Sequence, residues 1–229
     1  MEHVLRLREV NGTLFIANDE ETGPYLWKTD GAMTLAAPVT ERYLMLDRDL
    51  VKVKDTLFFP ADGSSAGTGL WKSDGTDAGT VLVKVLTSDS WRIHYQCLVA
   101  VEDELFFSVY LAGGSYVLWK SDGTEAGTVV VKDFGPISSS PCVVPDAFLE
   151  GTGSVLLTVD DGANTTLWKS DGTEAGTVPL HGAGTPGRPL APEGFARVGD
   201  TVFFSARGEA GQELWKTDGT AEGTRLVKD

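Results

Sequence analysis

The segment LWKSDGTEAGTVVVKD at 118–133 decides the fold, because its first half occurs five times along the chain. The other copies are LWKTDG at 26–31, LWKSDGTDAGT at 70–80, LWKSDGTEAGT at 167–177 and LWKTDGTAEGT at 214–224. Their tryptophans, 44 to 49 residues apart, are Trp27, Trp71, Trp119, Trp168 and Trp215. A repeat of this period indicates an array of one small structural unit, and five copies fill all 229 residues.

Each copy also shares a second segment, which lies upstream of its tryptophan. In VEDELFFSV at 101–109, two β-rich runs flank the turn Glu102-Asp103, and VNGTLFIA at 10–17 contains the Asn-Gly pair of a tight hairpin. The strands LWKS and TVVVKD flank an Asp-Gly turn, which predicts a second hairpin. No window has the spacing of an amphipathic helix. The sequence therefore predicts an all-β fold with four antiparallel strands in each copy.

Four strands repeating every 44 to 49 residues are typical of a β-propeller blade. We predict one domain over 1–229, a five-bladed β-propeller with blades at approximately 1–38, 39–86, 87–134, 135–182 and 183–229. A solenoid is the alternative, but it would need atypical capping repeats, and the fifth copy is the most regular one. Because both chain ends fall between blades, we expect no strand exchange at ring closure and termini that lie close together.

The composition excludes several classes of protein. Thirty-three acidic residues against 19 basic ones give a net charge of −14, the wrong sign for binding nucleic acid. The longest apolar runs are far too short for a membrane span. The start MEHVLRLREV lacks the features of a secretory signal, which indicates a cytoplasmic, mature or excised chain. Cys97 and Cys142 are too few for a disulfide framework, and their pairing stays open.

The repeated side chains are expected to be structural. The tryptophans fill the core, since neighbours cover both sides of a blade. Each repeated aspartate precedes a glycine and can bond to the amides of its own turn. These aspartates are Asp30, Asp74, Asp122, Asp171 and Asp218. Calcium is the alternative ligand, but one carboxylate in each turn falls short of a calcium site. We expect no other metal or cofactor, and lysines after the tryptophans that are solvated and pair with nearby carboxylates.

The copy ELWKTDGT at 213–220 resembles the ELWxxDGT repeat of bacterial surface-associated proteins, and the resemblance extends over all five copies. It implies a repeat module on exported or cell-surface proteins, with no catalytic residues to carry over. The turn is also similar to the Asp-box of sialidase-type propellers, where the aspartate is structural. The first copy departs from the pattern at 31–38, which predicts a shortened outer hairpin. The leading glutamate is replaced by Tyr25, Gly69, Val117 and Thr166.

Function is expected on the loops that differ among the copies. The loop between the second and third strands and the link to the next blade emerge on one face, and the links vary in length. The most individual link, TSDSWRIHYQ at 87–96, offers aromatic and polar side chains that suit a sugar or a protein hot spot. Alternatively, its tryptophan packs the link onto the disc. The candidate ligand-binding residues are Trp91, Arg92, His94, Tyr95, Tyr43, Tyr116, His181 and Arg188.

These observations predict a non-catalytic recognition module that binds a glycan or a protein partner through its variable loop face. Two alternatives stay open. One is a purely structural or assembly module of a larger bacterial surface protein. The other is a glycoside-acting hydrolase, which would need two carboxylates from different blades. The sequence contains no GxSxG elbow, and we do not predict an enzyme.

Overall fold

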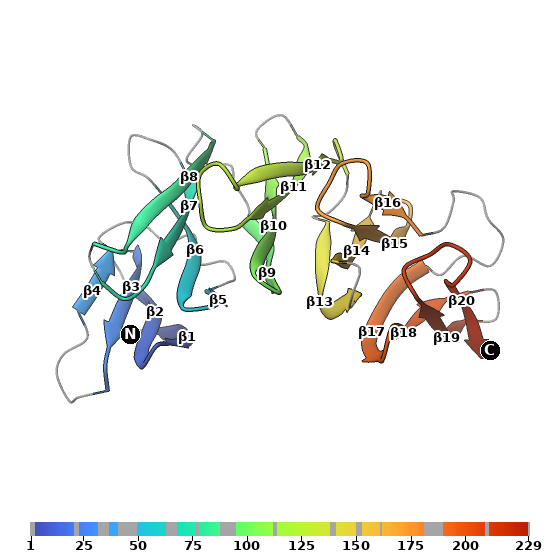
Figure 1. Cartoon of the computed structure of the whole chain (residues 1–229), viewed down its shortest axis with the longest axis horizontal. Helices are drawn as coiled ribbons and strands as arrows, with labels where there is room; N and C mark the ends of the chain where they lie inside the picture. The colour runs from blue at the N-terminus through green and yellow to red at the C-terminus, as the bar shows by residue number, and fades with distance from the viewer. Residues whose placement is uncertain are drawn as a thin grey trace. The chain divides into compact units, whose positions relative to one another are not determined.

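The computed structural model (Figure 1) contains only β-strands and turns in the part of the chain that it describes. The described residues are 3–20, 23–31, 37–40, 50–62, 68–76, 78–87, 95–111, 114–137, 141–149, 153–160, 162–180, 190–208 and 211–228. The prediction of an all-β, antiparallel fold is confirmed for these residues. No long apolar helix that could cross a membrane occurs among them.

The strands form five antiparallel sheets, and each sheet consists of four strands that are consecutive in sequence. The first contains β1 (His3–Val10), β2 (Thr13–Glu20), β3 (Gly23–Thr29) and β4 (Ala37–Thr40). The second contains β5 (Val51–Val53), β6 (Thr56–Asp62), β7 (Thr68–Ser73) and β8 (Val81–Thr87). The third contains β9 (Tyr95–Val101), β10 (Glu104–Tyr110), β11 (Tyr116–Ser121) and β12 (Val129–Asp133).

The remaining two sheets follow the same order. The fourth contains β13 (Cys142–Leu149), β14 (Ser154–Asp160), β15 (Thr165–Ser170) and β16 (Val178–Pro179). The fifth contains β17 (Leu190–Val198), β18 (Thr201–Arg207), β19 (Gln212–Thr217) and β20 (Arg225–Lys228). One sheet therefore corresponds to one copy of the sequence repeat.

Tight turns join the first two strands of the sheets, as the sequence predicts. Asn11 and Gly12 have φ angles of 52° and 77°, the left-handed pair that a type I′ hairpin requires. Lys54 and Glu102 occupy the first position of the corresponding turns, and each has a φ of 51°. The turn conformation is thus retained where the sequence offers no glycine or asparagine at that position.

The outer hairpin of the first copy is not shortened, and that prediction is wrong. In every sheet the fourth strand begins ten residues after the repeated tryptophan, at Ala37, Val81, Val129, Val178 or Arg225. The strand register explains this constant length. Trp27 pairs with Pro38, as Trp71 pairs with Leu82, so the ladder fixes the distance although the intervening sequence differs.

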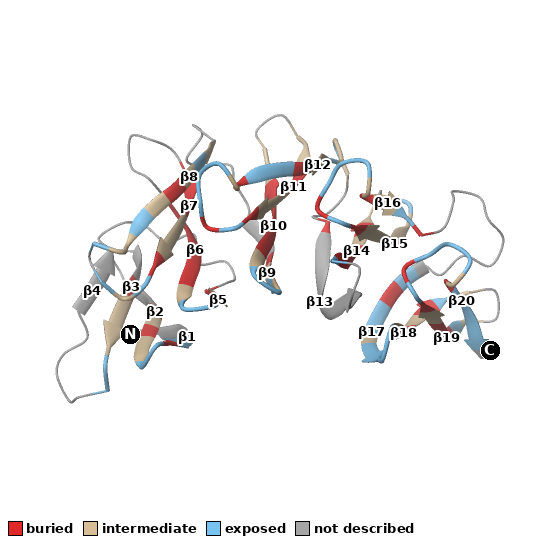
Figure 2. Ribbon diagram, viewed as in Figure 1, coloured by how far each residue is buried: buried red, intermediate tan, exposed pale blue. Residues whose placement is uncertain are grey.

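The chain divides into two compact units, and each has its own core. The first unit comprises Met1–Gly113 with Lys120–Val129, and the second comprises Gly114–Trp119 with Val130–Asp229. Figure 2 shows the buried residues of the sheets in red. The core of the first unit contains Val10, Phe15, Ala17, Leu26, Leu50, Leu57, Phe59 and Ala61, with Trp71 packed against it. The core of the second contains Leu156, Leu167, Leu180, Val202, Phe204, Ala206 and Trp215, with Phe195 against it.

Both cores join consecutive sheets through their apolar faces. In the first unit, side chains of the first and second sheets contribute to one cluster, and in the second unit those of the fourth and fifth sheets do so. This is how neighbouring sheets of a propeller are held together. The predicted ring of five blades, its closure, the blade boundaries and the single domain stay predictions.

Candidate functional site

The Asp-Gly turn connects the last two strands of a sheet, and its polar side chains bond to one another. In the third sheet, Asp122 Oδ1 accepts hydrogen bonds from the backbone N–H and the hydroxyl of Thr124, at 2.8 and 2.7 Å. The Thr124 hydroxyl oxygen accepts the N–H of Gly127 at 2.9 Å. Thr128 Oγ1 donates to the Thr124 carbonyl at 2.6 Å and lies 2.7 Å from the buried Ser121 hydroxyl. The repeated polar side chains of the turn are therefore hydrogen-bonded within the turn itself.

The same set of bonds is present in the second, fourth and fifth sheets, over residues 73–80, 170–177 and 217–224. The amide and the hydroxyl of the following threonine stabilise the charged carboxylate. They hold the pKa values of Asp74, Asp122 and Asp218 below the usual range of a carboxyl group. The second glycine of the turn is also explained, because a Cβ on Gly127 would collide with the Asp122 carboxylate.

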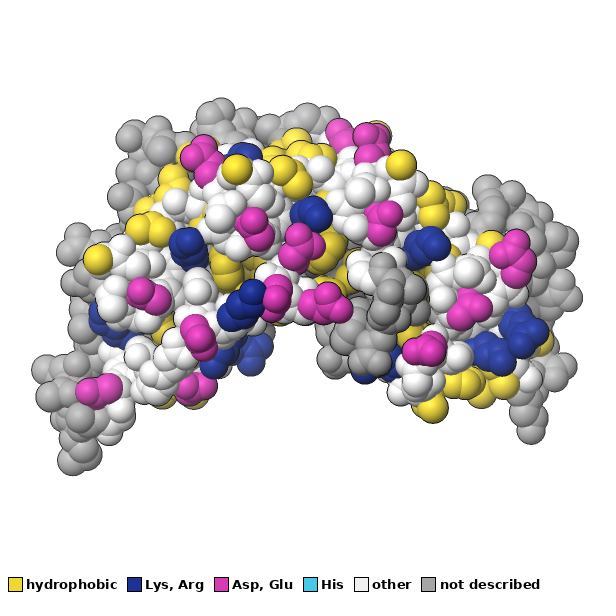
Figure 3. Space-filling model, viewed as in Figure 1, with side chains coloured by type: hydrophobic (Ala, Val, Ile, Leu, Met, Phe, Trp, Pro, Cys, Tyr) yellow, Lys and Arg dark blue, Asp and Glu magenta, His cyan; other side chains and the backbone are white. Residues whose placement is uncertain are grey.

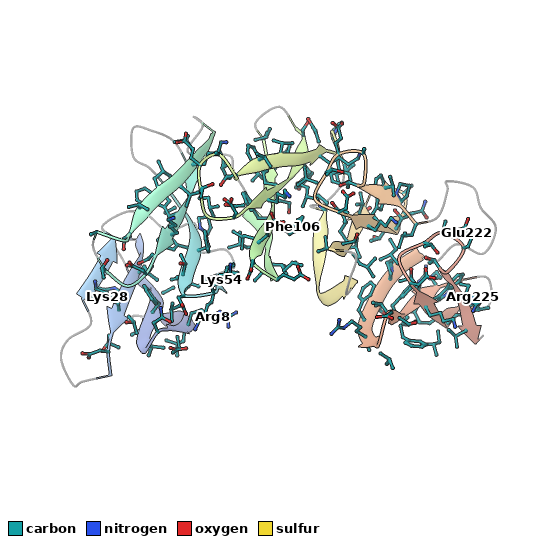
Figure 4. The ribbon with its side chains drawn as sticks, viewed as in Figure 1. Arg8, Lys28, Lys54, Phe106, Glu222 and Arg225 are labelled. Carbon is teal, nitrogen blue, oxygen red and sulfur yellow. The ribbon has the colours of Figure 1, made fainter. Side chains whose placement is uncertain are left out.

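Two of the repeated lysines connect neighbouring sheets. Lys28, which is labelled in Figure 4, donates from Nζ to the Gly75 carbonyl at 2.7 Å, and Lys72 Nζ donates to the Gly123 carbonyl at 2.8 Å. Both ammonium groups also interact electrostatically with the carboxylate of the turn to which they bond, so the nearby carboxylate that the sequence predicts is present beside the carbonyl. Lys120 pairs with the carboxylate of Glu104, at 3.3 Å.

A depression of about 270 Å³ lies at the other end of the fourth sheet, where β14 is connected to β15. It is lined by Asp160, Gly162, Ala163, Asn164 and Thr165 of this connection and by Ala191 and Arg207 of the fifth sheet. The loop between the second and third strands and the start of the next sheet therefore meet here. These are the two segments that the sequence places on the variable face.

The depression combines four kinds of polar group. Asp160 Oδ1 accepts the N–H of Gly162 at 2.8 Å, which fixes the carboxylate at the end of β14 and leaves further acceptor capacity on its two oxygens. The exposed Arg207 contributes a guanidinium at the end of β18. Asn164 and Thr165 add an amide and a hydroxyl. With both charges and neutral donors and acceptors present, the depression suits a ligand rich in hydroxyl or amide groups.

Local backbone strain occurs at the same place. Ala191 has a φ of 48°, although alanine gains nothing from the left-handed region that would offset its steric cost. Such strain persists only where the surrounding structure imposes it, and it is common at binding sites. Figure 3 shows acidic and basic side chains interspersed over the visible face, rather than one basic patch. No cluster of metal-ligating side chains was found among the described residues.

Most of the predicted ligand-binding residues lie outside the described residues: Trp91, Arg92, His94, Tyr43, His181 and Arg188. Tyr95 begins β9, but its side chain is not described, nor are those of Cys97 and Cys142. Tyr116 is described as half-buried, and its backbone N–H donates to the Gly135 carbonyl at 3.0 Å. The structure therefore brings none of the other candidates to Tyr116 within the described ranges. Sequence reasoning missed Asp160, Asn164 and Arg207, although VDDGANTT and SARGEAGQ were recognisable as second loops.

No family model and no curated protein matches the chain. Solved β-propellers do match it in structure. Oligopeptidase B from Leishmania major superposes with a TM-score of 0.64 and 12% identity, over 100% of this chain and 34% of that one. TolB from Acinetobacter baumannii gives 0.50 and 16%, over 98% and 54%. The β-propeller domain of the trilobed protease from Pyrococcus furiosus gives 0.50 and 12%, over 100% and 72%.

These likenesses show that the chain has a β-propeller fold. The chain spans about one third of the oligopeptidase and about half of TolB. At such low identities the likeness extends to the fold alone, because propellers with unrelated functions share it.

Proposed function

We propose that the chain is a non-catalytic recognition module that binds a glycan or a protein partner through its variable loop face. The depression between Asp160 and Arg207 carries this proposal, because it is a concave polar site formed by loops that differ among the copies. Sugars are recognised by carboxylate, amide and guanidinium groups that bond to several hydroxyls at once. The backbone of a peptide offers the same donors and acceptors.

The separation of structural and individual polar residues supports this proposal. The repeated aspartate and threonine side chains are bonded within their own turns, as Asp122 and Thr124 are. The side chains that line the depression do not belong to the repeat. A ligand can therefore bind to them without breaking the bonds that hold the sheets.

A structural or assembly role is the second candidate, and one observation favours it. The bonds from Lys28 and Lys72 to the turns of the next sheets indicate that repeated residues hold neighbouring sheets together.

The resemblance to ELWxxDGT repeats supports placing such a module on a bacterial cell surface, within a larger protein. We propose five blades closed without strand exchange for either role, since every sheet consists of consecutive strands.

The test is binding of the purified chain to a glycan array, with and without calcium, compared with an Arg207→Ala variant. If the depression is the site, wild type binds and Arg207→Ala loses the signal. Arg197→Ala is the matched control, because Arg197 is an exposed arginine on β17 that does not line the depression. Loss of the signal on calcium removal would favour the calcium alternative.

Two further results would redirect the proposal. Binding that survives Arg207→Ala but is lost in Trp91→Ala would place the site on the link at 87–96 instead. An absence of glycan binding, together with capture of one protein by wild type and not by Arg207→Ala, would identify the ligand as a protein. Turnover of a chromogenic glycoside panel would contradict the non-catalytic assignment.

A further inference from the structure

The depression at the end of β14 lies wholly within the second unit of the chain, and it holds two opposite charges. Arg207 contributes a guanidinium from the fifth sheet, and Asp160 contributes a carboxylate from the fourth. The ion pairs among the described residues involve other groups, so these two charges line one depression without pairing with each other. A ligand that complements the depression must therefore offer a partner to each charge.

The carboxylates of the fifth sheet do not neutralise Arg207. The strand register places Gln212 beside Arg207, and the Gln212 amide donates to Glu193 Oε1 at 2.7 Å, which engages that carboxylate. Glu213 is the register partner of Ala206, so its side chain lies on the opposite face of the sheet from that of Arg207. The positive charge of Arg207 is therefore left for a group that enters the depression.

The backbone that follows Arg207 is fixed from two sides. The N–H of Gly208 donates to the Gly211 carbonyl at 2.8 Å, which closes the connection between β18 and β19. A Cβ on Gly208 would collide with the carboxylate of Glu213, which is only 7% exposed. A buried side chain thus packs directly against this backbone. The position of Arg207 in the depression is set before a ligand binds, which lowers the cost of ordering it.

The described residues that line the depression include no aromatic side chain; they are Asp160, Gly162, Ala163, Asn164, Thr165, Ala191 and Arg207. A sugar ring therefore finds no apolar platform here on which to stack. Its affinity must come from polar contacts, and hydrogen bonds to charged groups are the strongest of these. A carboxylate that accepts two parallel N–H groups from a guanidinium gains both energy and a defined orientation.

Asp160 restricts the kind of anion that fits. An ionised carboxylate only accepts hydrogen bonds, so the part of the ligand beside Asp160 must carry donors. A phosphate group, with its higher charge, would be repelled by Asp160. A sugar that bears one carboxylate has a single charge for Arg207 and hydroxyl donors for Asp160. Its other hydroxyls match the amide of Asn164 and the hydroxyl of Thr165.

The size of the depression indicates how much of a ligand it holds. Its volume of about 270 Å³ is just below the roughly 300 Å³ at which pockets begin to enclose a small molecule. Gly162 and Ala163, which line it, are both exposed. The depression therefore suits one unit of a chain that continues into solvent better than a free amino acid, which needs an enclosing pocket.

We propose, resting on the recognition function proposed above, that the depression binds one carboxylate-bearing sugar unit, a uronate, of an acidic polysaccharide. Arg207 donates both hydrogen bonds of its guanidinium edge to the uronate carboxylate. Asp160 accepts hydrogen bonds from ring hydroxyls, and Asn164 and Thr165 bond to the remaining ones. The opposite charges of the depression then each have a partner in a single sugar unit.

The net charge of the chain opposes this ligand at long range only. A charge of −14 repels an acidic polysaccharide as a whole. At an ionic strength of 0.15 M the repulsion decays over about 8 Å, whereas the contact with Arg207 is made at hydrogen-bond distance. Short oligosaccharides at this salt concentration are therefore the appropriate probes, because few of their charges lie outside the depression.

The test is calorimetric titration of the purified chain with tetrasaccharides of galacturonate, glucuronate and mannuronate, each beside its methyl ester. The ester removes the negative charge and keeps the ring hydroxyls. At least one of the acids should bind, and its ester should bind roughly tenfold more weakly or worse, since the charge-assisted pair is lost. The preferred sugar identifies the arrangement of hydroxyls that the depression accepts.

Variants of Arg207 assign the carboxylate contact. Arg207→Gln should weaken binding of the acid to the level of the ester and should leave binding of the ester unchanged. Arg207→Lys keeps the charge without the planar fork, so its affinity should fall between the two. Arg197→Gln is the control, because it makes the same change in net charge at an exposed position of β17 outside the depression. Circular dichroism would establish that each variant is folded.

The results that overturn this ligand differ from those that overturn the recognition function. If acid and ester bind equally, or if Arg207→Gln weakens both alike, the site recognises sugars without selecting a carboxylate. Loss of binding in EDTA would assign the contact to a bridging calcium ion rather than to Arg207. Capture of a protein without any sugar binding would leave the recognition function in place and reject the uronate. A chain that binds no sugar and no protein would reject both.

Discussion

The two ends of β15 in the fourth sheet differ in what their polar groups do. At the Ser170 end, Asp171 Oδ1 accepts the N–H and the hydroxyl of Thr173, and Ser170 bonds to Thr177, both of them buried. At the Thr165 end, side chains of similar chemistry line an open depression. One strand therefore joins a turn that is closed on itself to a loop that faces solvent.

The comparison separates two reasons for a polar residue in a repeat protein. The Ser170 end is repeated in the second, third and fifth sheets with the same bonds, so its sequence is restricted by packing. The Thr165 end belongs to one copy, and its side chains line the depression. Repetition therefore indicates structure here, and a residue found in one copy is the better candidate for recognition.

The largest effect is expected from Gly176→Ala at the closed end. A Cβ at this position would occupy the place of the Asp171 carboxylate, and moving the carboxylate would break its bonds to Thr173. We expect a loss of about 3 kcal/mol in the free energy of unfolding, from overpacking together with lost hydrogen bonds. Urea denaturation of the variant and the wild type measures it.

Gly153→Ala is the matched control for that variant. Gly153 has a φ of 62°, but nothing lies within 4 Å of its Cβ position, so the cost is that of the left-handed backbone alone. We expect about 1 kcal/mol there. Equal losses for the two variants would mean that the turn can rearrange around a side chain, and the closed end would then be less rigid than its bonds indicate.

An intermediate effect is expected when a hydroxyl is removed from each end of β15. Thr173→Val removes the donor to Asp171 and the acceptor for the Gly176 N–H. It should cost about 1.5 kcal/mol. Thr165→Val changes a residue that lines the depression, and it should cost less than about 0.5 kcal/mol. Denaturation curves that rank the two variants in the opposite order would contradict the comparison.

Much of the fold can be predicted from the sequence, because each copy of the repeat contains the residues that mark its strands and turns. The tryptophan spacing gives the number of sheets, and the Asp-Gly and Asn-Gly pairs give both hairpins of a sheet. The error concerned the first outer hairpin. Its sequence has lost the turn motif, but the pairing of Trp27 with Pro38 keeps the connection at full length. The length of this hairpin is therefore determined by the strand pairing and does not require the turn motif.

The candidate site follows from the sequence only in part. The depression is lined by residues of the loops that the sequence places on the variable face, and a recognition role for that face stays a prediction. Its residues were not identified, because Asp160 and Arg207 come from different copies and meet only when two sheets pack. The sequence favours Trp91 instead, because it is the one tryptophan outside the repeat. The bond from Lys28 to Gly75 was missed for the same reason, since it too joins two copies.

Acid should weaken the closed turns, and the sign follows from the pKa shifts. The pKa values of Asp74, Asp122 and Asp218 are lowered in the folded chain, so their charged forms stabilise it at neutral pH. That stability is lost as the pH falls from about 4 through the lowered pKa values, where the unfolded chain binds more protons. Denaturation at pH 6 and pH 3 measures the loss.

The control for this pH effect replaces all three aspartates with asparagine, which keeps an acceptor oxygen in each turn. The triple variant should be less stable than wild type at pH 6, and its stability should change less between pH 6 and pH 3. If the pH dependence is unchanged, other carboxylates cause the loss of stability in acid. The closed turns would then contribute no more to that loss than the Thr165 end of β15 does.

The smallest effect on stability is expected from Arg207→Ala at the open end. Its side chain is exposed, and its backbone pairing with Leu190 and Gln212 does not depend on the guanidinium. We expect a change of less than about 0.5 kcal/mol in the free energy of unfolding. The same variant should lose ligand binding, because the depression would keep Asp160 but no cation to oppose it.

A loss of more than about 1 kcal/mol in the free energy of unfolding of Arg207→Ala, measured by urea denaturation, would place Arg207 among the structural residues. The depression would then be a gap between two sheets rather than a recognition site, and the contrast between the two ends of β15 would disappear.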